Sequence, residues 1–246
     1  SIGGFARRLA QRLRGREPEG QYAQIIAREV DRLERIVQDV GALSRQVHLS
    51  LVETDVHELL QECLVLFAER IANQNVQVRM TLVERPPVLP LDPVQVKQAV
   101  LNLLTNALEA MPDGGVLTIG TQAVSGDHGP PDDPSVGQSG AEAGPAEGRE
   151  PFSRPSPGPT DLPASGEWVV ISVGDTGGGI PQEILDEVFN PFFTTKDAGT
   201  GLGLTLVRRV ARAHGGRVEM DNRPGEEVTF RLCLPVGDAG RSPGVY

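Results

Sequence analysis

The chain has 246 residues, a formal net charge of −10 and a sequence pI of about 4.9. This length is enough for one large or two modest domains, each able to bury a core. The acidic balance argues against nucleic-acid binding, which usually needs a concentrated basic surface. No apolar run is long enough to span a bilayer, so we expect a cytoplasmic protein that reaches a membrane, if at all, only through segments preceding Ser1.

Residues 1–50 have the pattern of a helical hairpin. Apolar residues share one face of a helix over residues 1–14, and the proline and glycines of residues 15–20 break it. A second helix is expected over residues 21–47, because apolar side chains recur at alternating spacings of four and three: Ile26, Val30, Leu33, Val37 and Val40. Two helices cannot bury so wide a stripe, so we expect a homodimer whose hairpins form a four-helix bundle. Packing of the hairpin on its own following domain is the alternative.

Residues 54–236 have the pattern of a compact α+β domain. Helices are expected from Thr54 or Asp55 to about residue 72, from Pro93 onward and over residues 202–213. Strands are expected over residues 76–82, 117–121, 168–173, 217–220 and 228–234. Three helices against a mixed sheet of about five strands predict a two-layer α/β sandwich.

Two segments and two cysteines complete this organisation. Residues 124–166 contain nine prolines and eight glycines, a composition that predicts a disordered insertion, and residues 237–246 are expected to form a flexible tail. Cys63 and Cys233 lie far apart in apolar surroundings without metal-type spacing, so both are expected to be reduced core residues.

Two asparagines stand out on the apolar helix that follows Pro93. Asn102 and Asn106 are four residues apart, so both project from one helix face, with Glu109 beside them. Burying an amide is costly unless it is hydrogen-bonded or ligated. An amide oxygen is a hard, neutral ligand that suits Mg²⁺, which takes negative ligands from phosphates. The pair therefore indicates a magnesium–nucleotide site, with two hydrogen-bonded core asparagines as the alternative.

Two glycine-rich patches follow. A carboxylate that ends an apolar strand can accept a hydrogen bond from an exocyclic amine such as that of adenine, and the glycines after it let a flat ring approach the backbone: Asp175-Thr-Gly177-Gly-Gly179-Ile180. The alternative is a glycine turn with an incidental aspartate. Backbone N–H groups at a helix N-terminus favour phosphate at the second patch, Gly199-Thr-Gly-Leu-Gly203. Lys196, just upstream, adds a point charge for the terminal phosphate.

In this order, and with the intervening Phe189-Asn-Pro-Phe-Phe-Thr-Thr-Lys196, the patches resemble the GHKL superfamily of sensor histidine kinases, DNA gyrase B, Hsp90 chaperones and MutL. The resemblance covers about residues 54–235, and residues 1–47 are similar to the dimerisation and phosphotransfer hairpin of the histidine kinases. It implies ATP bound with Mg²⁺, Asn106 as the metal ligand, Asp175 on adenine and a lid from about Gly177 to Gly203. The ATP-binding residues that it implies are Asn102, Asn106, Ala110, Asp175, Gly177, Gly179, Ile180, Lys196, Thr200, Gly201, Leu202, Gly203, Leu204 and Thr229.

The activity that the resemblance implies is a protein-histidine kinase that serves a response-regulator receiver domain. Gyrase-type relatives carry a water-activating glutamate at the position of Asn102, and an amide cannot act as a base, which favours transfer to a protein over hydrolysis. Residues 1–6 look like the continuation of the acceptor motif, so the accepting histidine is expected before Ser1. The visible histidines are interpreted as structural: His48, His57, His128 and His214. A nucleotide-sensing or scaffold module, a GHKL-type ATPase and an anti-sigma-type serine kinase are the alternatives.

Overall fold

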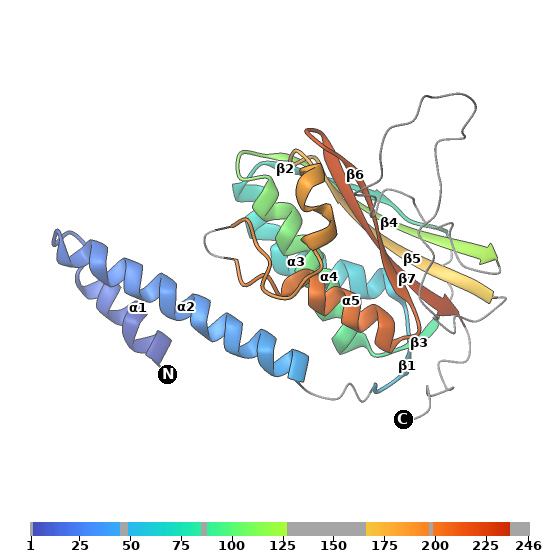
Figure 1. Cartoon of the computed structure of the whole chain (residues 1–246), viewed down its shortest axis with the longest axis horizontal. Coiled ribbons are helices and arrows are strands. Elements are labelled where there is room, and N and C mark those ends of the chain that lie inside the picture. Colours follow the sequence, from blue (N-terminus) through green and yellow to red (C-terminus); the bar gives the residue numbers. More distant parts are fainter. Residues whose placement is uncertain (1, 45–48, 85–87, 127–165, 197–198, 237–246) are drawn as a thin grey trace, which may run out of the picture. The chain divides into compact units, whose positions relative to one another are not determined.

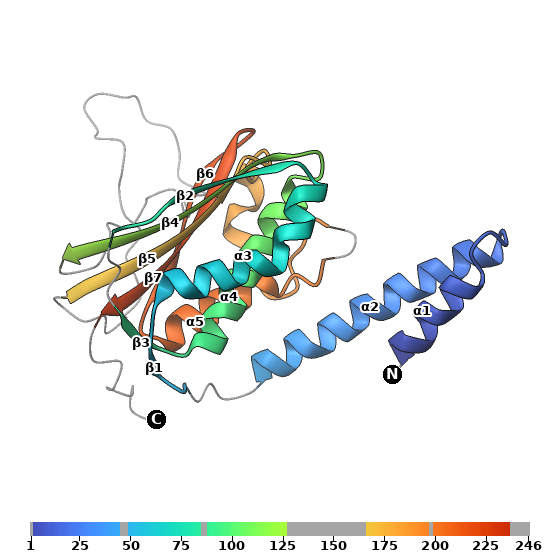
Figure 2. The same ribbon diagram turned by 180° about the vertical axis from the view of Figure 1, so that it is seen from behind.

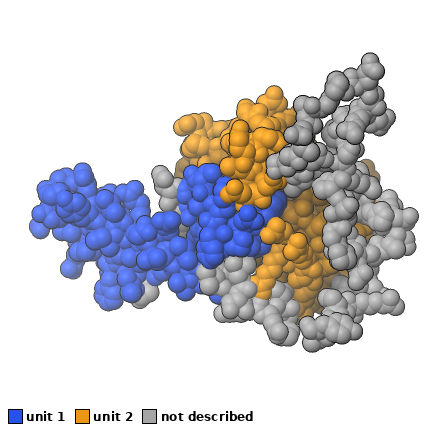
Figure 3. Space-filling model, viewed as in Figure 1, with its two compact units in different colours: residues 1–46, 189–206 blue, residues 47–188, 207–246 orange. Residues whose placement is uncertain are grey.

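The computed structural model describes residues 2–44, 49–84, 88–126, 166–196 and 199–236 (Figure 1). Most of the predicted insertion, the predicted tail, His48 and His128 lie outside these residues. The chain divides into two compact units, drawn in blue and orange in Figure 3. The first unit comprises residues 1–46 and 189–206, and the second comprises residues 47–188 and 207–246. No helix in the described part of the chain is long and apolar enough to cross a membrane.

A helical hairpin makes up the N-terminal part of the first unit, as the periodicity predicts. Its helices are α1 (Ile2–Arg12) and α2 (Glu19–Ser44). They approach closely because the side chains between them are small: Gly3, Ala6, Ala23 and Ala27 are all buried. The Gly3 N–H donates to the Glu34 carboxylate at 3.3 Å, and Arg7 forms an ion pair with Asp31 at 2.5 Å.

Large apolar side chains remain exposed on this hairpin. They include members of the predicted seam and their neighbours: Ile2, Phe5, Leu9, Tyr22, Ile25, Ile26, Leu33 and Val37. Exposed large apolar side chains in this number are more typical of an interaction surface than of a solvated one. The homodimer stays a prediction, and the exposed face is consistent with it.

A mixed five-stranded sheet forms one layer of the second unit. Its strands are β2 (Val76–Thr81), β4 (Gly115–Gly126), β5 (Gly166–Asp175), β6 (Arg217–Arg223) and β7 (Glu227–Val236). The order across the sheet is β2-β4-β5-β7-β6; β2 and β4 are parallel and the other neighbours are antiparallel. The five-strand expectation is confirmed, but β4 and β5 extend beyond the predicted ends, until Gly126 pairs with Gly166.

Helices cover one face of this sheet (Figures 1 and 2). They are α3 (Val56–Asn73), α4 (Pro93–Ala110) and α5 (Gly203–Ala213). Asp55 caps α3 by accepting from the His57 and Glu58 N–H groups, and Asp92 caps α4 in the same way. The two-layer sandwich is therefore confirmed. Two short strands, β1 (Val52–Thr54) and β3 (Leu89–Leu91), pair with each other, and a short 3₁₀ helix, η1, spans Gln182–Glu187.

Strand alternation separates two sets of side chains. On the helix-covered face, Ile119, Val173 and Phe230 lie in one cross-strand row and are buried. On the other face Trp168, Val170 and Cys233 form a separate buried cluster, and the Arg217 guanidinium lies 5.2 Å from the Trp168 ring centroid. Cys63 and Cys233 are both free and buried as expected, and burial raises the pKa of Cys63 to about 11 and that of Cys233 to about 12.

Candidate nucleotide-binding site

One face of α4 carries the predicted polar residues. Asn102, Asn106 and Ala110 follow one another at four-residue intervals and are half-buried, whereas the intervening side chains, such as Leu103 and Leu104, are in the core. The Asn102 Nδ2 atom is buried and has no hydrogen-bond partner. A buried, unpaired amide donor is costly in a folded protein, so this atom favours a ligand over the alternative of fully bonded core asparagines.

The loop after β5 lies against the end of this helix. Asp175 is 6% exposed, and its Oδ1 accepts from the Gly177 N–H at 3.0 Å. A Cβ at Gly177 would lie 2.5 Å from the Ala110 Cβ and 2.8 Å from Asp175 Oδ1. Only glycine allows this close approach. The structure therefore brings together Asp175, Gly177 and Ala110, three of the predicted residues.

The remaining residues of this loop are held by neighbouring strands. The Thr176 hydroxyl accepts from the Val116 N–H of β4 at 3.0 Å. Gly179 has a φ of 64°, which favours glycine, and an added Cβ would also collide with the Arg223 carbonyl. Ile180 is half-buried and is hydrogen-bonded through its backbone to Asn222 of β6. The predicted adenine loop is thus held by contacts with β4 and β6 at several residues.

Thr229 is not placed with the other predicted adenine contacts. It pairs with Gly174, and a Cβ on that glycine would lie 2.6 Å from the Thr229 hydroxyl, so both lie on the face opposite Asp175. The β7 residue opposite Asp175 is Val228, which is buried. A shift of one residue reverses the direction of a side chain, so the register separates Thr229 from Asp175, and the contact of Thr229 with adenine stays a prediction.

The predicted phosphate segment belongs to the first unit. The Phe192 N–H donates to the Gly201 carbonyl at 3.0 Å, and the Thr200 hydroxyl accepts from the Leu202 N–H at 3.3 Å. Gly201 has a φ of 66°, and an added Cβ would collide with the Phe192 backbone. Leu202 is buried and Leu204 half-buried, α5 begins at Gly203, and Lys196 is exposed. Gly201 therefore has a steric reason to be glycine that is independent of any ligand.

The described histidines are engaged in the folded core. His57 Nε2 is 2.9 Å from the Thr121 hydroxyl. His214 is buried: its Nε2 accepts from the Asp92 N–H at 3.0 Å and its Nδ1 lies 2.8 Å from the Val210 carbonyl. Burial lowers the pKa of His214, so the neutral form with a proton on Nδ1 fits both contacts. Both side chains are hydrogen-bonded within the fold, and their structural interpretation stays a prediction.

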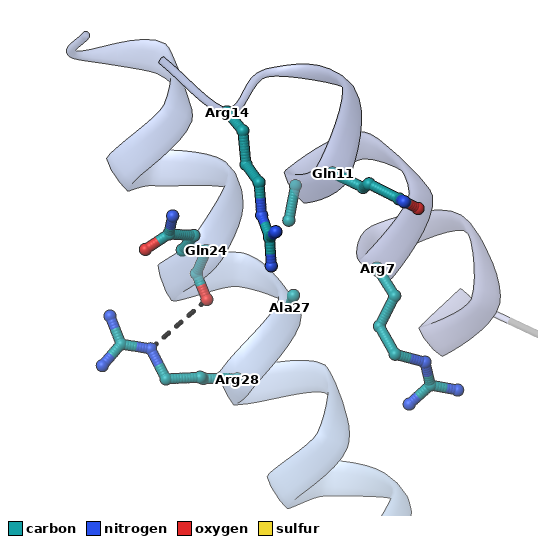
Figure 4. A pocket seen from close by; sticks show the side chains of 7 residues that line it. Arg7, Gln11, Arg14, Gln24, Ala27 and Arg28 are labelled. Carbon is teal, nitrogen blue, oxygen red and sulfur yellow. Dashed lines mark hydrogen bonds between the residues drawn. The ribbon is translucent and has the colours of Figure 1, made fainter. Parts of the chain in front are cut away.

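A separate hollow of about 480 Å³ lies on the hairpin, between α1 and α2 (Figure 4). Its polar lining is basic, and the residues around it are Arg7, Ala10, Gln11, Arg14, Gln24, Ala27 and Arg28. The Arg28 side chain donates to the Gln24 carbonyl at 3.4 Å. None of the predicted nucleotide contacts belongs to this hollow.

Comparisons with known proteins identify the fold. Residues 152–238 match the family described as histidine kinase-, DNA gyrase B-, and HSP90-like ATPase. Sensor histidine kinase ZraS of Escherichia coli (strain K12) is 31% identical over 243 residues, covering 99% of this chain and 43% of that protein. Sporulation kinase D of Bacillus subtilis (strain 168) is 30% identical, covering 96% of this chain and 38% of that protein. The chain carries a histidine-kinase ATP-binding core.

Solved structures agree with this histidine-kinase core. Histidine kinase ThkA in complex with the response regulator protein TrrA matches with a TM-score of 0.64 and 27% identity, over 98% of this chain and 58% of that chain. Full-length ShkA in complex with AMPPNP matches with a TM-score of 0.65 over 95% of this chain and 42% of that chain; at 22% identity it shows the fold alone. The chain spans less than half the length of the curated relatives it matches.

Two residues that hold the glycine loop after β5 were not predicted from the sequence, Thr176 and Asn222. Thr176 lay inside the recognised patch, but its bond to β4 depends on the register of two strands distant in sequence. Asn222 lies more than forty positions beyond the loop that it contacts and precedes an ordinary Arg-Pro-Gly turn. Nothing local distinguishes it from a turn asparagine.

Proposed function

We propose that this chain is the ATP-binding catalytic region of a sensor histidine kinase. It binds ATP together with Mg²⁺ and transfers the γ-phosphoryl group to a protein histidine, from which the phosphate passes to an aspartate of a response-regulator receiver domain. The family match and the kinase relatives support the reaction class. The observation that carries the proposal is the buried, unpaired Nδ2 of Asn102, on the α4 face that ends at the glycine loop.

Asn106 is the proposed ligand of Mg²⁺. Its half-buried amide is neutral, and within the described residues no group of three or more His, Cys, Asp or Glu side chains could hold a metal ion. A metal bound at Asn106 therefore takes its negative ligands from the phosphates, as Mg²⁺ commonly does. When bound, Mg²⁺ neutralises phosphate charge, and the residues of the chain position the nucleotide.

Each remaining contact has a proposed role. Asp175 accepts from the adenine amine, and Gly177 and Gly179 leave room for the ring. Lys196 and the glycine-rich residues before α5 contact the phosphates; because they belong to the first unit, this assignment rests on their sequence. The positioning of two reactants accounts for most of the catalysis expected of such a site.

The phosphate acceptor is proposed to lie on a helical hairpin like that of α1 and α2, on a segment preceding Ser1. His57 and His214 are both hydrogen-bonded within the fold, so neither is the proposed acceptor. The exposed apolar face of α1 and α2 is the proposed homodimer surface. A response-regulator receiver domain is the proposed partner, in line with the ThkA–TrrA complex.

Calorimetry with AMPPNP tests nucleotide and metal binding together. The wild-type chain should bind AMPPNP with Mg²⁺ and much more weakly without it, and Asn106→Ala should lose this dependence. Asn73→Ala, at the exposed end of α3, is the matched control and should bind as wild type does. Equal affinity with and without Mg²⁺ in the wild type would refute the metal assignment.

Phosphotransfer separates a kinase from a nucleotide sensor. With Mg-[γ-³²P]ATP the chain alone should acquire no acid-labile label. Mixed with a longer form that extends upstream of Ser1 and carries Asn106→Ala, it should label that partner across mixed dimers. Absence of label despite demonstrated mixed dimers and ATP binding would favour the sensor alternative, and label on the chain itself would identify His57 or another visible histidine as the acceptor.

A further inference from the structure

Asn222 of β6 makes a two-point contact with the glycine loop. Its Oδ1 accepts from the Ile180 N–H at 2.8 Å, and its Nδ2 donates to the Ile180 carbonyl at 2.8 Å. One side-chain amide thereby satisfies both backbone groups of a single residue, as a neighbouring strand would do. The two bonds together fix the distance between Ile180 and β6 and the orientation of the Ile180 backbone.

The turn between β6 and β7 adds backbone contacts to the same loop. The Gly225 N–H donates to the Gly178 carbonyl at 2.7 Å, and the Gly178 N–H donates to the Glu226 carbonyl at 3.2 Å. Gly179 approaches the Arg223 carbonyl so closely that no Cβ would fit. The loop after β5 is thus packed onto a hairpin that follows it by some forty residues.

Asn222 and Asp175 belong to one cross-strand row. Asp175 pairs with Val228, and Val228 pairs with Asn222, so the three lie side by side on the helix-covered face. Asp175 holds the start of the loop through the Gly177 N–H, and Asn222 holds its end through Ile180. Between these two anchors the loop lies against Ala110 of α4.

We propose that Asn222 is a positioning residue for the purine base: it holds the backbone of residues 177–180 at the separation from α4 that admits adenine. This inference rests on the proposed ATP binding. A short segment with three glycines, such as residues 177–180, has many accessible backbone conformations. Ordering such a segment when the nucleotide binds would reduce the affinity, so a loop that already has its bound conformation binds more tightly. The two hydrogen bonds from the Asn222 amide hold the loop in one conformation before the nucleotide binds.

The test compares three variants in the full chain. Asn222→Ala removes both bonds. Asn222→Asp has the same shape and keeps the acceptor for the Ile180 N–H, but it loses the donor to the Ile180 carbonyl. Arg223→Ala is the matched control, because it removes only the exposed ion pair with Glu227 in the same hairpin, at 3.0 Å.

Binding of AMPPNP and of the corresponding GTP analogue is measured by calorimetry. Asn222→Ala should bind AMPPNP at least tenfold more weakly and should show a smaller preference for it over the GTP analogue. Asn222→Asp places a carboxylate oxygen opposite the Ile180 carbonyl oxygen, so its loss should be at least as large. Arg223→Ala should stay within twofold of wild type. In phosphotransfer to the longer form, Asn222→Ala should raise KM for ATP and leave kcat close to wild type. Hydrogen exchange without nucleotide should be faster at Gly178 and Ile180 in Asn222→Ala.

Specific results overturn the inference. Wild-type affinity and selectivity in a folded Asn222→Ala chain would show that the loop does not need the amide. An equal loss for both nucleotides, in step with the melting temperature, would show a merely structural role. If Asn222→Ala fails to fold, an unchanged preference of Asn222→Asp for AMPPNP over the GTP analogue would also overturn the inference. A wild-type chain that binds no AMPPNP refutes the proposed function itself, whereas unchanged exchange at the loop refutes only the role of Asn222.

Discussion

Replacement of Gly177 by alanine tests the contact between the glycine loop and α4. The added Cβ would lie 2.5 Å from the Ala110 Cβ and 2.7 Å from the Ala110 carbonyl oxygen. Non-bonded carbon atoms prefer about 3.5–4.0 Å, so the loop or the helix end must move by about 1 Å. Overpacking of this kind costs about 1–3 kcal/mol. If the strain is relieved by moving the loop, we expect ATP affinity to fall by about tenfold, which corresponds to about 1.4 kcal/mol.

Gly178→Ala is the matched control for this substitution. Nothing lies within 4 Å of its added Cβ, but its φ of 97° strains any other residue. Both variants should therefore melt at lower temperature, whereas only Gly177→Ala should lose affinity for AMPPNP in calorimetry. If Gly177→Ala binds AMPPNP as tightly as Gly178→Ala does, the loop does not meet the nucleotide where α4 ends.

The other predictions concern the adenine carboxylate, a buried histidine and the insertion. Asp175→Asn should weaken AMPPNP binding more than tenfold, since a hydrogen bond to a charged group contributes about 1.5–3 kcal/mol; an unchanged preference over the GTP analogue would remove it from the site. The pKa of His214 is depressed by burial, so its contribution to stability is complete above the unfolded pKa of about 6.5 and is lost as pH falls through the depressed folded value. The melting temperature should fall between pH 7 and pH 5.5, and less so in His214→Gln. Removing residues 127–165 and joining Gly126 to Gly166 by a short turn should leave the melting temperature and the AMPPNP affinity unchanged, because those two residues already pair; a clearly lower melting temperature would contradict this.

Periodicity predicted most elements because burial imposes it directly. The alternation of Val228, Phe230 and Leu232 and the proline at residue 93 each indicated the correct element. The short strands β1 and β3 were missed, since three residues are too few to show a period. The extension of β4 beyond residue 121 was also missed, because its partner strand lies beyond a long insertion.

The candidate site was predictable wherever glycine, amide or carboxylate residues depart from an apolar pattern. Asn102, Asp175 and Gly177 were identified in this way, and the structure gives each a physical reason. Thr229 and Asn222 show the limit of such reasoning. The place of Thr229 depends on strand register, and that of Asn222 on a contact between segments forty residues apart. Neither property is encoded in a local motif.

Because Gly126 pairs with Gly166 at the ends of β4 and β5, the chain can be divided into two fragments between these residues. A cut there leaves Asn102 and Asn106 on one piece and Asp175 and Asn222 on the other. Since β5 lies between β4 and β7, each piece has a bare strand edge that the other completes. We expect the two pieces to bind nucleotide only after reassembly. Fused separately to two proteins, they would form a split reporter whose output is ATP-analogue binding.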